Sequence, residues 1–141
     1  MTGSFPATPL RILVVDDDAD SRFLCKRLLE RLGHFVRVAE EGIEAIGLLR
    51  DGSWDVVLSD QNLPGATGVD VLERAHRLQP SARRILMSTL LDPQVKKDAQ
   101  ERGRVHAYIE KRFDRSAFAY SGAAILVSTQ GHDPDARAAE G

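Results

Sequence analysis

Five short apolar runs, spaced regularly along the chain, constrain its fold more than any other feature of the sequence. Each run is bounded by polar or turn-forming residues, and the segments between the runs place apolar residues at helical spacing. This alternation predicts buried parallel strands joined by crossover helices. The predicted strands are Arg11–Val15, Phe35–Ala39, Asp55–Ser59, the run around Ile85–Met87, and His106–Lys111.

Amphipathic segments follow the predicted strands. The first helix is expected to be capped by Asp18 or Asp20 and to end at Gly33. Its predicted apolar face comprises Phe23, Leu24, Leu28, Leu29 and Leu32. The other expected helices are Glu41–Arg50 with Ile43 on its apolar face, Val69–Leu78, Pro93–Arg102 stopped at Gly103, and a weak one over Arg115–Val127 that is interrupted by Gly122.

The composition is that of an ordinary globular domain. A chain of 141 residues with 43% hydrophobic and 28% charged residues can build a single core. A net charge of −2 and the lack of a zinc-ligand pattern argue against direct binding to nucleic acid. No apolar run is long enough to span a membrane, so we expect a cytoplasmic protein. The single Cys25 excludes an internal disulfide and is expected to be a small buried residue.

The two ends of the chain differ from its middle. Residues 1–9 contain two prolines and small polar residues, which predicts a flexible leader. Residues 129–141 lack an apolar pattern and predict a disordered tail. The folded domain is therefore expected over residues 10–128.

Polar residues that could bind a ligand or react stand where the predicted strands end. They are Asp16 and Asp17 after the first strand, Asp60 after the third, Thr89 after the fourth and Lys111 at the end of the fifth. The carboxyl ends of parallel strands meet at one edge of the sheet, and ligands of open α/β sheets bind there. Carboxylates, a hydroxyl and an ammonium at that edge predict a site for a divalent cation and a phosphoryl group.

The carboxylates would repel one another unless a cation lay among them, and Mg²⁺ is the natural candidate because it prefers hard oxygen ligands. Asp60 stands alone at its strand end and is the predicted nucleophile toward phosphorus. The cation would contact one phosphoryl oxygen, and Lys111 and Thr89 suit the other two. Each residue also has an ordinary explanation as a helix cap, a strand-end residue or a surface lysine, so the prediction depends on the whole set.

Through these strand-end residues, and over roughly Arg11 to Val127, the chain resembles the receiver domains of bacterial two-component response regulators. The resemblance implies a doubly wound, flavodoxin-like sheet of order 2-1-3-4-5 with helices on both faces. It implies that Asp60 accepts a phosphoryl group. The implied Mg²⁺ ligands are Asp16, Asp17, Asp60 and the backbone carbonyl of Asn62, and the implied phosphoryl-binding and switch residues are Thr89, Lys111 and Tyr108.

The resemblance also implies a function in signalling. A sensor histidine kinase or a histidine phosphotransfer protein would phosphorylate Asp60, and the chain would act as a stand-alone receiver and not as an enzyme. Phosphate would draw Thr89 inward and let Tyr108 turn, which changes the face formed by the fourth helix, fifth strand and fifth helix. That face would bind a downstream protein, and a phosphorylation-linked homodimer is left open.

Two residues depart from the family pattern. Arg112 replaces the usual proline after the lysine, so we expect a trans bond there and a displaced loop. Leu90 is larger than the residue that usually follows the threonine, which suggests that the chain accepts phosphate slowly or holds it for a long time. Trp54 lies at the far end of the strand that leads to Asp60, so it is expected only to pack.

Two other functions are left open by the sequence. The chain could be a receiver-like interaction module that works without phosphorylation. It could also be a haloacid-dehalogenase-like phosphatase, because Asp16-Asp17-Asp18 contains an Asp-x-Asp motif. That second class needs an acidic pair beyond its fourth strand, where this chain offers only Asp92, so it ranks low.

Overall fold

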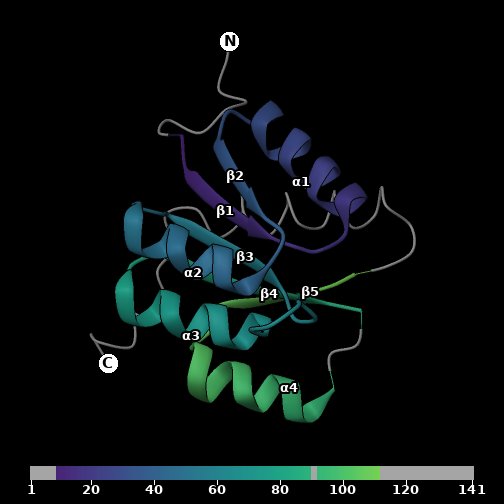
Figure 1. Ribbon diagram of the computed structural model, residues 1–141, viewed down its shortest axis with the longest axis vertical. Helices are drawn as coiled ribbons and strands as arrows, with labels where there is room; N and C mark the ends of the chain where they lie inside the picture. Colours follow the sequence, from purple (N-terminus) through teal and green to yellow (C-terminus); the bar gives the residue numbers. More distant parts are fainter. Residues whose placement is uncertain (1–8, 90–91, 112–141) are drawn as a thin grey trace.

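The structure is a computed structural model that describes residues 9–89 and 92–111. Its centre is a five-stranded parallel sheet in the order β2-β1-β3-β4-β5 (Figure 1), which confirms the predicted sheet order. The strands are β1 (Arg11–Val15), β2 (Phe35–Ala39), β3 (Val56–Asp60), β4 (Arg83–Ser88) and β5 (Ala107–Glu110). Predictions for the leader, Leu90, Arg112, the weak last helix and the tail lie outside the described residues.

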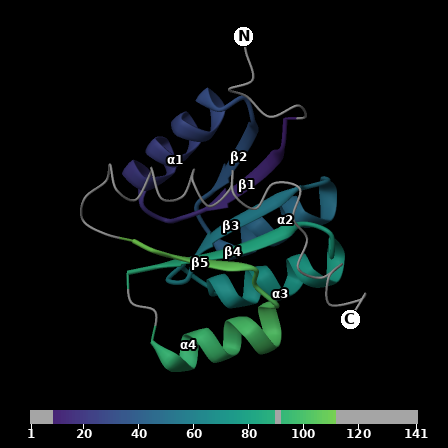
Figure 2. The same cartoon turned by 180° about the vertical axis from the view of Figure 1, so that it is seen from behind.

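Helices cover both faces of the sheet. One face carries α1 (Ala19–Arg31), and the other carries α2 (Gly42–Asp51), α3 (Gly68–Leu78), α4 (Pro93–Asp98) and the π-helical segment η1 (Ala99–Gly103) (Figures 1 and 2). Alternate residues of β1 enter different cores, with Ile12 and Val14 facing α1, and Leu13 and Val15 facing α2 and α3. The central strands are buried on both sides, as their continuous apolar sequences predict.

Two residues predicted on the apolar faces of their helices point toward solvent instead. Phe23 in α1 is 61% exposed and Ile43 in α2 is 67% exposed. The buried positions are Cys25 in α1 and Ala45 in α2. Each misassigned residue stands two positions before a buried one, which turns it by about 200° around the helix axis. The guanidinium of Arg27 lies 5.9 Å from the Phe23 ring centroid and partly shields it.

Both ends of α1 follow the predicted capping chemistry. The N-cap of α1 is Asp18, whose side chain accepts a hydrogen bond of 2.9 Å from the Ser21 N–H. Beyond α1, Gly33 adopts a φ of 96°, which glycine tolerates best. At α3, Thr67 and Asp70 form a reciprocal capping box. These caps fix where α1 and α3 begin.

The segment after α4 differs from the expected regular helix. Residues Ala99–Gly103 form one π-helical turn, and the left-handed residue that ends it is Arg104, with a φ of 49°. Gly103 instead allows close packing, since a Cβ added there would lie 3.3 Å from Leu72 Cβ. Arg102 ties the turn to α3 through contacts of 2.6 Å with Asp70 and 3.1 Å with Glu73. The turn is thereby fixed to the rest of the domain.

Arg84, the second residue of β4, is fully buried although it is charged. Its guanidinium donates to four carbonyl oxygens, those of Pro80 and Ala82 before the strand and those of Gly103 and Arg104 before β5. The backbone N–H of Arg84 donates to Nδ1 of His106 at 2.9 Å. Nothing in the sequence pattern distinguishes this arginine from the others. It joins both chain segments that enter the last two strands.

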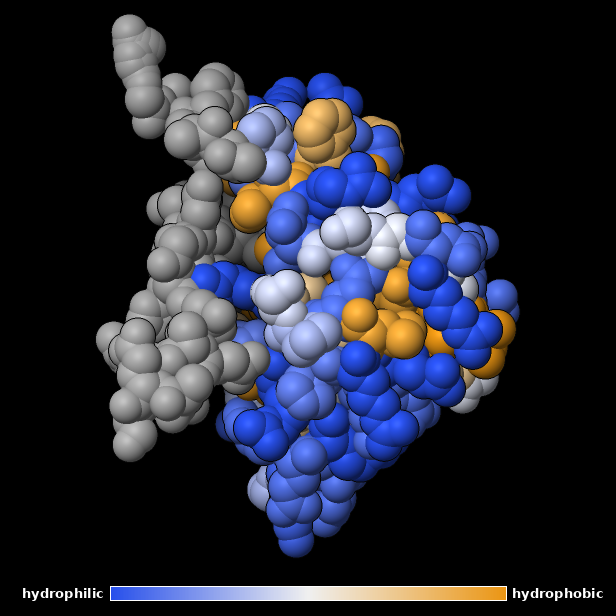
Figure 3. Space-filling view, turned by 90° about the vertical axis from the view of Figure 1, so that its left-hand side faces the viewer, coloured by the Kyte–Doolittle hydropathy of each residue, from blue (hydrophilic) through white to orange (hydrophobic). Residues whose placement is uncertain are grey.

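Trp54 packs at the amino-terminal edge of the sheet, as predicted. It is 9% exposed, and its indole N–H donates to the Leu48 carbonyl at 2.9 Å. Cys25 is buried as expected, and burial, reinforced by the charge of Asp16, raises the pKa of its thiol to about 12. The side of the molecule in Figure 3 is largely hydrophilic, with apolar residues in small groups. Among the described residues, none of the helices has the length and apolar character needed to cross a bilayer.

Candidate phosphoryl and metal site

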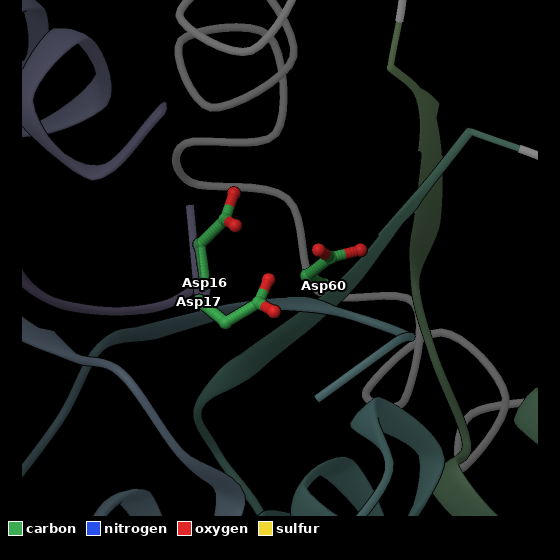
Figure 4. Close-up of side chains that lie close together, drawn as sticks. All are labelled: Asp16, Asp17 and Asp60. Atoms are coloured by element: carbon green, nitrogen blue, oxygen red, sulfur yellow. The ribbon is translucent and has the colours of Figure 1, made fainter. Parts of the chain in front are cut away.

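Three carboxylates meet at the carboxyl-terminal edge of the sheet. β1 and β3 pair in register through Val15 and Ser59, so the residues that follow these two, Asp16 and Asp60, come level with each other. With Asp17, they offer ligand oxygens that all lie within 4.8 Å of one another (Figure 4). Asp16 and Asp60 are buried and Asp17 is exposed. The predicted convergence of these acids is therefore present.

Lys111 contacts two of the three acids. Its Nζ lies 2.7 Å from Oδ2 of Asp16 and 3.3 Å from Oδ2 of Asp60. Its backbone N–H donates to the Ser88 carbonyl at 2.8 Å, which extends the pairing of β4 and β5 by one step. The ammonium is thus held at the sheet edge by its backbone and by its charge.

The charges in this cluster change one another's ionisation. Burial raises the pKa of Asp60 to about 6, the charge of Lys111 opposes that shift, and the charge of Asp16 adds to it. Burial by itself would lower the pKa of Lys111, but the hydrogen bond and charge of Asp16, with help from Asp60, raise it above its ordinary value. Lys111 therefore remains an ammonium near neutral pH, where it can neutralise an incoming anion.

Asp16 is oriented by neighbours that the sequence analysis did not identify. Its Oδ1 accepts from the Asp18 N–H at 3.0 Å, and its carbonyl accepts from Arg22 at 2.8 Å. The same guanidinium also donates to Glu40 at 2.9 Å and so links α1 to the end of β2. No local pattern distinguishes Arg22 from the other basic residues of α1, so its role depends on geometry.

The loop after Asp60 folds back on the strand that carries it. The Gly68 N–H donates to the Gln61 carbonyl, and the Val69 N–H donates to the Gln61 side chain, both at 3.0 Å. A Cβ on Gly68 would lie 2.3 Å from the Asp60 carbonyl oxygen. Asn62, whose carbonyl is the predicted metal ligand, is an exposed residue of this loop. The close approach at Gly68 sets the path of the loop.

Replacing Gly68 by alanine is expected to lower the free energy of unfolding by about 2 kcal/mol, because two backbone segments must separate to admit the methyl group. Urea denaturation would measure the loss. Gly47→Ala is the matched control, since a Cβ on that helical glycine meets nothing within 4 Å. Equal stability of the two variants would contradict the close approach.

The remaining predicted residues stand on the neighbouring strands. Thr89 follows β4 directly and is exposed. Tyr108 lies within β5 and is half-buried. Its hydroxyl accepts a hydrogen bond of 2.7 Å from Gln100 and donates one of 3.2 Å to the Lys96 carbonyl. Tyr108 is therefore fastened to α4 and η1.

The donor set fits a hard divalent cation. Asp16, Asp17 and Asp60 supply close carboxylate oxygens, which are the ligands that Mg²⁺ prefers. Asp18, the second acid of the Asp-x-Asp motif, instead accepts from both the N–H and the hydroxyl of Ser21 and caps α1. Asp18 thus serves as the cap of α1, while the carboxylate cluster consists of Asp16, Asp17 and Asp60.

Comparison with known protein families gives a match over most of the chain. The family model of the response regulator receiver domain matches residues 12–136. This range includes Asp16, Asp17, Asp60, Thr89 and Lys111.

Segments of larger proteins resemble the chain. The virulence sensor protein BvgS of Bordetella pertussis is 40% identical over 73 residues, which are 52% of this chain and 6% of BvgS. The DNA-binding transcriptional regulator NtrC of Azospirillum brasilense is 34% identical over 103 residues, which are 73% of this chain and 21% of NtrC. The chain thus spans less than a quarter of the length of either relative.

Two solved structures share the fold. The signal receiver domain of an HD domain-containing protein from Pseudomonas fluorescens has a TM-score of 0.75 and 26% identity, and covers 89% of this chain and 100% of its own. A CheY-like response regulator receiver domain protein from Methanospirillum hungatei has a TM-score of 0.76 and 25% identity, with the same coverage.

Proposed function

Because the chain belongs to the response regulator receiver domain family, we propose that Asp60 is its phosphoacceptor and that Mg²⁺ assists the transfer. The observation that carries this proposal is the Lys111 ammonium, which contacts Asp16 and Asp60 beside the third carboxylate of Asp17. An ammonium and a carboxylate cluster at one edge of the parallel sheet suit a phosphoryl group, whose charge must be neutralised as it moves.

In the proposed reaction, a carboxylate oxygen of Asp60 attacks the phosphorus of a phosphohistidine. A new O–P bond forms, the P–N bond breaks, and its electron pair returns to the imidazole, which takes up a proton from water. Lys111 is placed to pair with a phosphoryl oxygen once Asp60 has lost its free charge. Mg²⁺ held by Asp16, Asp17, Asp60 and the Asn62 carbonyl would neutralise further charge on the phosphoryl oxygens.

The donor in this proposal is a sensor histidine kinase or a histidine phosphotransfer protein, and the chain is an acceptor and not an enzyme. Phosphate on Asp60 draws the Thr89 hydroxyl inward, and Tyr108 leaves its contacts with α4 and turns toward the space this opens. The altered surface of α4 and β5 then binds a downstream protein. A cytoplasmic location remains part of this proposal.

Intact mass after incubation with acetyl phosphate and MgCl₂ tests the acceptor. The parent chain is expected to gain one phosphoryl group, and Asp60→Asn is expected to gain none. Asp51→Asn is the matched control, because Asp51 is an exposed residue at the end of α2. The chelator EDTA should suppress the gain in the parent chain.

The outcomes separate the two receiver-like functions. A phosphoryl group that persists in Asp60→Asn would place the acceptor elsewhere. Absence of any gain in a folded parent chain would favour the interaction module that works without phosphorylation.

A further inference from the structure

We propose that Gln100 and the Lys96 carbonyl form a latch on the Tyr108 hydroxyl, and that this latch sets how readily phosphorylation switches the domain. The inference rests on the proposed function and adds a positioning residue, Gln100, that neither the motif residues nor the acidic site includes. The term latch denotes the two hydrogen bonds that join Tyr108 to Gln100 and Lys96.

The latch uses both hydrogen-bonding capacities of the tyrosine hydroxyl. Nε2 of Gln100 donates to the hydroxyl oxygen at 2.7 Å, and the hydroxyl donates to the Lys96 carbonyl at 3.2 Å. The Lys96 ammonium adds a weaker contact, 5.9 Å from the ring centroid. All three contacts come from α4 and η1, so they exist only while the ring lies against these elements.

The anchor of the latch is fixed to the rest of the domain. Gln100 lies in the π-helical turn η1. Arg102 in the same turn is paired with Asp70 and Glu73 of α3, and the carbonyls of Gly103 and Arg104 are bound by the buried Arg84. Because η1 is held from two sides, it cannot easily follow the ring when Tyr108 turns. The hydrogen bonds to Tyr108 therefore break instead of moving with it.

The latch also connects Tyr108 to the backbone of α4. The Lys96 carbonyl accepts a hydrogen bond from the Ala99 N–H at the end of the helix as well as from Tyr108. Departure of the hydroxyl leaves this carbonyl with one protein donor fewer at the junction of α4 and η1. A turn of the ring thus changes the hydrogen bonding of α4, which forms part of the surface that would meet a downstream protein.

Contacts made in only one of two states shift the equilibrium toward that state. By linkage, they weaken the binding of ligands that favour the other state. Loss of the Gln100 hydrogen bond is therefore expected to strengthen binding of a phosphoryl group or its analogue. A single neutral hydrogen bond corresponds to a change of about fivefold in such an equilibrium.

Titration with beryllofluoride and MgCl₂, followed by backbone amide NMR signals of α4, tests the latch in the full chain. Gln100→Ala is expected to reach half-saturation at a beryllofluoride concentration about fivefold lower than the parent. Gln94→Ala is the matched control, because Gln94 bonds to Asp98 on the exposed side of α4 and should titrate like the parent. In the unliganded Gln100→Ala variant, the labelled ring signal of Tyr108, assigned with Tyr120→Phe, should move toward its bound position.

A double variant separates the latch from general weakening of the fold. In a Tyr108→Phe background the hydroxyl is gone, so Gln100→Ala should no longer change the titration. If Gln100→Ala only lowers the unfolding temperature and titrates like the parent, the latch is overturned while the proposed phosphoacceptor stands. A folded parent chain that does not respond to beryllofluoride at all would overturn both.

Discussion

Replacing the buried Arg84 by methionine is expected to lower the free energy of unfolding by about 4 kcal/mol. Methionine fills much of the same space but cannot donate a hydrogen bond, so four carbonyl oxygens lose the guanidinium that serves them. Buried polar groups without a partner cost about 1–3 kcal/mol each, although some of these carbonyls will reach water after relaxation. Urea denaturation followed by circular dichroism measures the change.

Arg74→Met is the matched control for Arg84→Met. Arg74 lies on the exposed side of α3, and its replacement should change the unfolding free energy by less than about 0.5 kcal/mol. Arg84→Lys keeps the charge but reaches fewer carbonyls, so an intermediate loss is expected. A loss of less than about 1 kcal/mol in Arg84→Met would show that the guanidinium does not organise the entry to β4 and β5.

Asp60→Asn is expected to stabilise the fold at pH 8, in the presence of a chelator, by about 2 kcal/mol. Burial raises the pKa of Asp60 from 3.8 to about 6, so the folded chain holds this proton more tightly than the unfolded chain does. The carboxylate therefore lowers the unfolding free energy progressively as the pH rises from about 4 to about 6, and the deficit persists above that range. Asparagine has the same shape and no charge, so it lacks this deficit.

Unfolding curves of the parent chain and Asp60→Asn at several pH values measure this effect. The difference between the two proteins should be small near pH 4 and should reach its full size above pH 6. The attraction of Lys111 already opposes the rise of the Asp60 pKa to about 6, and that rise sets an upper limit of roughly 3 kcal/mol on the gain. A difference that does not change with pH would contradict a raised pKa of Asp60.

The order of strands and helices was predictable because each strand is short, apolar and followed by a segment with helical spacing. Boundaries shifted only slightly, as where Asp60 turned out to be the last residue of β3 and not the first residue after it. The exposed positions of Phe23 and Ile43 were not predicted, since an apolar residue near a helix start can satisfy a loose helical spacing and still point away from the sheet. The π-helical turn also gave no signal in the sequence.

The acidic cluster with Lys111 was predictable for a different reason. Parallel strands in register bring their carboxyl ends to one edge of the sheet whatever the loops do. Asp16 and Asp60, on neighbouring strands, therefore come level, and Lys111, beyond β4, ends at the same edge. The contacts of Arg22 and Gln100 were not predictable. Each depends on how far a long side chain reaches from one element to another, and one-dimensional spacing carries no record of that reach.

The hydrogen bonds of Gln61 to Gly68 and Val69 clamp the two ends of the loop that follows Asp60. The chain between the clamped ends can therefore change length without moving the strand or the helix on either side. Loop closure becomes only about 0.6 kcal/mol less favourable for each doubling of loop length. A short peptide inserted between the exposed residues Pro64 and Gly65 should be tolerated, which makes this point a place to graft an epitope or a reporter peptide beside the acidic cluster.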